Sequence, residues 1–103
     1  MLLDLLKQRR SIRKYEDKAV EKEKLDVILK SALLSPSSRG IRPWEFVVVT
    51  DKKVLEKLSQ CKAHGSQFLK DAPLGIVVIA DTQASDVWIE DVSIASTIIQ
   101  LSA

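Results

Sequence analysis

Apolar residues recur along much of the chain with the spacing of α-helices. One stretch places its apolar side chains at positions i, i+3, i+4 and i+7 of a single helical face, namely Leu25, Ile28, Leu29 and Ala32. This pattern predicts a helix over residues 21–34, which ends before Pro36 because proline cannot continue a helix and disfavours helical dihedrals at Ser35. A cluster of leucines predicts a shorter helix over residues 2–9.

Two other segments have the composition of β-strands. Residues 44–50 are mainly aromatic and β-branched, and residues 74–80 are apolar throughout. An unbroken apolar run is typical of a strand covered on both faces, so we expect the second strand to be buried. Between the strands, Thr50 or Asp51 can cap a further helix, and residues 66–71 fit a short one.

The last segment, residues 86–103, is apolar around most of the circumference of its expected helix. Its two apolar stripes are Trp88, Val92, Ala95 and Ile99, and Ile94, Ile98 and Leu101. Such a helix is either buried or shared with a partner chain. The pattern stops without a glycine cap, and only two strands are clear, so we expect the sequence to be incomplete at its C-terminus.

The order of these elements bounds the fold class. Strands alternating with helices indicate an α/β or α+β protein. No repeat, low-complexity tract or glycine–serine linker divides the sequence, so we expect a single domain over residues 1–103. With 46% hydrophobic and 29% charged residues, the composition is that of an ordinary soluble globular protein.

Charge and cysteine content narrow the function classes. A formal net charge of +2 is too small to indicate nucleic acid as a partner, and no apolar run approaches the ~20 residues of a membrane span. A single cysteine, Cys61, fits a reducing compartment, and the N-terminus lacks the pattern of a signal peptide. We therefore expect a cytoplasmic protein.

Two clusters of polar residues offer weak signals. Cys61 and His64 can share a helical face, but two ligands do not make a zinc site, so we expect no metal centre and a half-buried Cys61. Acidic residues gather near the expected start of the last helix, at Asp81, Asp86, Glu90 and Asp91. Acidic groups there interact favourably with the helix dipole, and we prefer this interpretation to paired-carboxylate catalysis.

The segment Arg9-Arg10-Ser11-Ile12-Arg13 carries the first candidate chemistry. Guanidinium groups bind phosphate bidentately and keep their charge at any working pH, and the serine hydroxyl adds a short donor. A dianionic phosphate monoester is the natural ligand for this set. A solvated basic turn is the alternative, and RNA binding is a third possibility that lacks the usual aromatic platform.

The segment Ser35-Pro-Ser-Ser-Arg-Gly-Ile-Arg-Pro-Trp44 carries the second. Its small residues permit close approach to the backbone and expose several N–H donors in one loop. Arg39 and Arg42 add planar cations that can hydrogen-bond to a heteroaromatic ring or stack on it. The alternative is an ordinary helix-to-strand connection with Trp44 in the core.

Together, these segments resemble the nitroreductase family of flavoproteins. The resemblance rests on five segments in order, residues 9–15, 35–38, 43–49, 68–73 and 88–91. It implies an α+β, sandwich-like fold with helices flanking a central sheet, cut short after the helix that begins near Trp88. Family members continue well beyond this length, so we expect the chain to carry only part of the site.

The resemblance also implies which residues bind a cofactor. FMN would be held by Arg9, Arg10, Ser11 and Arg13, with the arginines on or near its phosphate. The isoalloxazine ring would be approached by Pro36, Ser37 and Ser38, usually from the other subunit of a homodimer, and the same loop supplies Arg39, Gly40 and Arg42. The family often has amides where this chain has Gly40 and Arg42, so the resemblance does not extend to the usual amide contacts, and an arginine there would favour anionic reduced flavin.

The implied activity is an FMN-dependent oxidoreductase. Hydride would pass from NAD(P)H through the flavin to a nitroaromatic, quinone or similar small molecule in a ping-pong sequence. The chemistry belongs to the cofactor, so no catalytic acid, base or nucleophile is assigned. The alternatives are a non-catalytic FMN- or nucleotide-binding module, an α/β interaction protein that associates through its last helix, and an inactive fragment.

Overall fold

A computed structural model describes all 103 residues of the chain. Its internal contacts gather into two compact units. Unit 1 comprises Met1–Arg10, Glu21–Phe46 and Val78–Ala103, and unit 2 comprises Ser11–Val20 and Val47–Val77.

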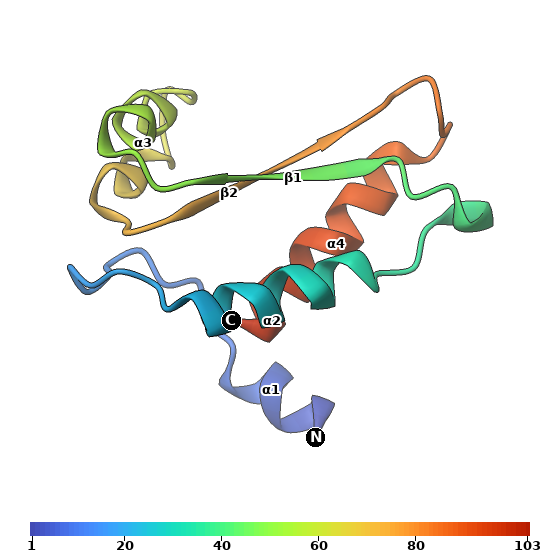
Figure 1. Cartoon of the computed structure of the whole chain (residues 1–103), viewed down its shortest axis with the longest axis horizontal. Coiled ribbons are helices and arrows are strands. Elements are labelled where there is room, and N and C mark those ends of the chain that lie inside the picture. Colours follow the sequence, from blue (N-terminus) through green and yellow to red (C-terminus); the bar gives the residue numbers. More distant parts are fainter. The chain divides into compact units, whose positions relative to one another are not determined.

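Unit 1 is mainly helical. Its helices are α1 (Leu2–Gln8), α2 (Lys22–Leu33) and α4 (Trp88–Ser102), and α2 packs against α4 (Figure 1). Ala32 of α2 and Ala95 of α4 are fully buried, and such small side chains let two helices approach closely. Near the C-terminal ends of both helices, the Ser102 hydroxyl donates to Ser31 Oγ at 3.2 Å. The predicted helix over residues 21–34 is thus confirmed to within one residue at each end.

Unit 2 is built around α3 (Lys52–Ser59), which packs on the short 3₁₀ helix η2 (Gln67–Asp71). Asp51 is the N-cap of α3, and its Oδ1 accepts hydrogen bonds from the backbone N–H groups of Lys53 at 2.8 Å and Val54 at 3.4 Å. Leu55 is fully buried. A Cβ added at Gly75 would lie 3.0 Å from Leu55 Cδ2, so any larger residue there would require the Leu55 side chain to shift.

The two strands form a two-stranded sheet and contribute residues to each unit. They are β1 (Trp44–Val49) and β2 (Gly75–Ala80). The N–H of Asp81, just after β2, donates to the carbonyl of Pro43, just before β1, at 2.9 Å. This bond joins the start of one strand to the end of the other, so the strands are antiparallel.

Two predictions about exposure are wrong. The apolar strand β2 is only partly buried along its length, and Ile79 is 43% exposed, because a single neighbouring strand leaves much of its surface uncovered. Cys61 is exposed rather than half-buried, since it lies in the bends that follow α3 and not in a regular element.

Several helices present apolar side chains to solvent in this chain. In α4 only Asp91 and Ala95 are buried, whereas Ile89 is 57% and Ile94 41% exposed. In α1 no residue is buried. The all-round apolar pattern of α4 therefore does not reflect burial within the chain. None of the helices combines the length and the apolar character that crossing a bilayer requires.

Candidate functional site

The arginine segment, residues 9–13, follows α1 directly. Arg9 is the C-cap of α1 and turns the backbone to an extended conformation at φ −56°, ψ 135°. The Arg10 guanidinium folds back, and its Nη1 donates to the carbonyls of Lys7 at 2.9 Å and Arg9 at 2.8 Å. These bonds satisfy carbonyl groups that the end of a helix leaves without partners. Nη1 of Arg10 is thus already hydrogen-bonded at the end of the helix. The exposed Arg9 guanidinium, by contrast, makes no hydrogen bond or ion pair in this chain.

The rest of the arginine segment belongs to unit 2. The hydroxyl of Tyr15 donates to the carbonyl of Ile12 at 2.8 Å, which closes a turn around Arg13. The Tyr15 ring lies against Phe68 with its centroid 6.0 Å away, so the turn is attached to η2. The Arg13 guanidinium is exposed and unpaired, and Ser11 is exposed as well.

The serine loop, Pro36–Arg42, lies in unit 1 between α2 and β1 (Figure 1) and contains the 3₁₀ turn η1 (Ser38–Gly40). Three of its residues have left-handed backbone dihedrals, with φ of 56° at Arg39, 63° at Gly40 and 54° at Arg42. For a residue other than glycine this conformation costs on the order of 1 kcal/mol. No atom lies within 4 Å of a Cβ added at Gly40, so its backbone angle and not a lack of space favours glycine.

Hydrogen bonds inside the serine loop hold this conformation. The N–H groups of Gly40 and Ile41 donate to the carbonyls of Ser37 and Ser38 at 3.1 and 3.2 Å. The N–H of Arg42 donates to Ser37 Oγ at 2.9 Å. The side chains of Arg39 and Arg42 make no hydrogen bond or ion pair and stay exposed, so both cations are free to meet a ligand.

A further contact anchors the serine loop to α4, and sequence reasoning missed it. The N–H of Ser38 donates to Oδ1 of Asp91 at 3.1 Å. Asp91 is only 2% exposed, and its Oδ2 accepts a hydrogen bond from the Ser85 hydroxyl at 3.2 Å. Ser85 Oγ in turn accepts from the N–H of Val87, the N-cap of α4, at 3.2 Å.

Asp91 lies in the first turn of α4 as expected, and the structure adds to that interpretation a buried contact with the serine loop. The position of Asp91 in the sequence already distinguishes it from the neighbouring acidic residues. Asp91 lies three residues after Trp88 and four before Ala95, so it interrupts an apolar stripe of the helix. A carboxylate on the apolar face of a helix must find donors inside the protein.

Within unit 1, no hydrogen bond or ion pair connects Arg9 or Arg10 to the serine loop. Two polar atoms at the ends of the loop, Ser35 Oγ and Trp44 Nε1, are buried without a hydrogen-bond partner.

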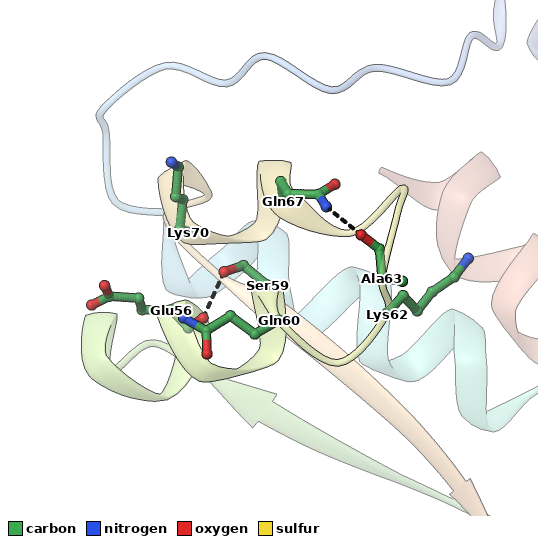
Figure 2. Close-up of a pocket in the computed structure, with 7 residues that line it drawn as sticks. All are labelled: Glu56, Ser59, Gln60, Lys62, Ala63, Gln67 and Lys70. Carbon is green, nitrogen blue, oxygen red and sulfur yellow. Dashed lines mark hydrogen bonds between the residues drawn. The ribbon is translucent and has the colours of Figure 1, made fainter.

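A pocket in unit 2 contains none of the predicted site residues. It encloses about 380 Å³ beside α3 and η2. Two of its polar side chains donate to backbone carbonyls of the lining: the Ser59 hydroxyl to Glu56 at 2.6 Å, and Gln67 Nε2 to Ala63 at 3.1 Å (Figure 2). The charged ends of Lys62 and Lys70 point away from each other (Figure 2). This pocket lacks the convergent free donors that an anion site needs.

Comparisons with known proteins identify the fold. A solved structure from Clostridium difficile, named "FMN-dependent Nitroreductase", is 63% identical and superposes with a TM-score of 0.95 over 97% of this chain and 58% of its own. A Desulfovibrio desulfuricans protein solved in complex with FMN is 28% identical, with a TM-score of 0.88 over 99% of this chain and 61% of its own. The mixed helix-and-strand architecture is therefore a nitroreductase fold.

The sequence comparisons agree. Residues 6–88 match the sequence model of the Nitroreductase family. A relative from Methanothermobacter thermautotrophicus, named "Putative NADH dehydrogenase/NAD(P)H nitroreductase", is 42% identical over 105 residues, covering 99% of this chain and 54% of the relative. The chain belongs to the nitroreductase family, and it spans a little over half the length of these relatives.

Proposed function

We propose that the protein carrying this chain is an FMN-dependent oxidoreductase. It takes hydride from NAD(P)H and passes it to a nitroaromatic, quinone or similar small acceptor in a ping-pong sequence. The observation that carries the proposal is the pair of exposed guanidinium groups at Arg9 and Arg13, which no acidic side chain of the chain neutralises. The names of the relatives, which include FMN and NAD(P)H, support the same cofactors.

The arginine segment fits the phosphate of FMN on grounds of charge. A dianionic phosphate requires cationic donors with fixed charge, and guanidinium supplies them in a planar fork. Arg9 and Arg13 are the free cations, Ser11 adds a hydroxyl donor, and Arg10 adds charge while part of its guanidinium holds the end of α1.

The serine loop fits the ring of FMN on grounds of shape. Pro36, Ser37 and Ser38 carry short side chains that permit close approach to the backbone, and the free guanidinium of Arg42 adds positive charge that favours an anionic reduced ring. When bound, FMN supplies the hydride chemistry, and the residues of the chain bind it, orient it and leave one face open to the donor and the acceptor.

We also propose that the protein is a homodimer whose flavin site is shared between the two subunits. Within unit 1, Arg9 and Arg10 make no hydrogen bond or ion pair with the serine loop, which suits a loop that serves the flavin of a second subunit. The exposed side chains of Ile89 and Ile94 on α4 supply apolar surface for such an interface. A cytoplasmic location belongs to the same proposal, because an exposed thiol such as Cys61 suits a reducing compartment.

FMN titration into the purified protein, followed by flavin fluorescence, tests the cofactor. Saturable binding is expected, with a dimer in sedimentation velocity of the same sample. Under anaerobic conditions NADH or NADPH should then bleach the bound flavin, and a nitroaromatic or a quinone should restore its colour. Binding without bleaching would favour the non-catalytic module, and absence of binding would contradict the FMN assignment.

A further inference from the structure

A buried carboxylate without a basic partner lies beside the serine loop. Asp91 is 2% exposed in the first turn of α4 and forms no ion pair. Burying an ionised carboxylate is costly unless hydrogen-bond donors replace water. The donors here are the N–H of Ser38 on Oδ1 and the hydroxyl of Ser85 on Oδ2, and the N-terminal end of the α4 dipole favours negative charge at the same place.

The contact acts on a loop that needs support. Arg39 and Arg42 hold left-handed backbone angles that residues other than glycine disfavour, so the conformation persists only where surrounding contacts hold it. Three of the hydrogen bonds described above join one loop residue to another. The Asp91 contact is the one that joins the loop to a residue distant in sequence, 53 positions away.

We propose that Asp91 is the positioning residue of the flavin loop. It fixes the backbone at Ser38 and thereby holds Pro36–Arg42 in the conformation that meets the isoalloxazine ring. The inference rests on the proposed function for the ligand, while the anchoring itself concerns the protein without FMN. In this role Asp91 acts on the flavin through the backbone of Ser38.

The chain offers a graded set of variants and a matched control. Asp91→Asn keeps the size and one acceptor oxygen but removes the charge, and Asp91→Ala removes the acceptor altogether. Ser85→Ala removes the donor on the far side of the carboxylate while leaving Asp91 in place. Glu90→Gln is the control, because Glu90 is exposed in the same helical turn and makes no hydrogen bond or ion pair.

The first measurement is amide hydrogen exchange of Ser38 by NMR in the protein without FMN. We expect exchange at Ser38 to be fastest in Asp91→Ala, intermediate in Asp91→Asn, and unchanged in Glu90→Gln. Ser85→Ala provides a milder variant if Asp91→Ala does not fold. Unchanged protection of Ser38 in folded Asp91 variants would overturn the proposal.

The second measurement is FMN affinity and the absorption spectrum of bound flavin, at a temperature where every variant is folded. We expect affinity to fall about tenfold in Asp91→Ala and by less in Asp91→Asn, because hydrogen bonds to charged groups contribute more than neutral ones. Faster exchange at Ser38 with unchanged FMN affinity and spectrum would overturn the positioning role. Absence of FMN binding by the unmodified protein would refute the proposed function instead, and the exchange measurement would still decide the anchoring.

Discussion

The arginine segment and the serine loop hold their side chains in different ways. Residues 9–13 have no regular secondary structure, and their free cations, Arg9 and Arg13, extend into solvent. The serine loop has left-handed backbone angles at three residues, and it is held by internal hydrogen bonds and by a contact to the buried Asp91. Charge tolerates a range of orientations around a phosphate, whereas a planar ring requires a surface of fixed shape. We interpret the first region as one that supplies charge and the second as one that supplies shape.

The largest expected effect comes from removing the free charge. Arg9→Ala/Arg13→Ala should weaken FMN binding by well over tenfold, since a dianionic phosphate would lose two charged hydrogen-bonding groups. Titrations at low and high salt should also show that the double variant has a weaker salt dependence than the unmodified protein. Equal FMN affinity in the two proteins would remove the phosphate assignment.

A smaller effect is expected from altering the shape of the serine loop. Gly40→Val forces a β-branched residue into a left-handed backbone and should lower FMN affinity about fivefold, with the salt dependence unchanged. Gly40→Ala should do less, because a Cβ alone meets no atom at this position. The measurement is the same titration at two salt concentrations. A salt dependence altered as strongly as in the arginine variant would abolish the distinction between the two regions.

The smallest effect on FMN should come from Arg10. Its guanidinium already binds two carbonyls at the end of α1, so Arg10→Ala should lower FMN affinity by only about twofold and the stability of the helix by about 0.5–1 kcal/mol. Thermal unfolding and FMN titration of the same preparation measure both quantities. A loss of affinity equal to that of Arg9→Ala would mean that Arg10 leaves the helix end to bind phosphate.

The sequence predicted the secondary structure closely because local signals determine it. Apolar periodicity located α2, Pro36 excluded a longer helix, and Asp51 acts as the expected cap of α3. Burial was less predictable because it depends on neighbours that local patterns do not specify. The strand β2 has the composition of a buried strand but pairs with β1 alone.

The candidate site was predictable in its charges and not in its backbone. The motif identified the arginines. Only the structure shows that the Arg10 guanidinium is hydrogen-bonded at the end of α1, whereas the Arg9 guanidinium makes no hydrogen bond or ion pair. Left-handed angles at Arg39 and Arg42 run against the local preferences of arginine. The contact from Asp91 to Ser38 joins residues 53 positions apart, a distance over which spacing rules carry no information.

The close approach of Gly75 to Leu55 has a consequence for how the sequence can change. A Cβ at position 75 would lie 3.0 Å from Leu55 Cδ2, so a larger residue at position 75 requires the side chain at position 55 to shift or to become smaller. In a double-mutant cycle, Leu55→Val and Gly75→Ala should together destabilise the protein less than the sum of the two single substitutions. The effect of a substitution at position 75 is therefore expected to depend on which residue occupies position 55.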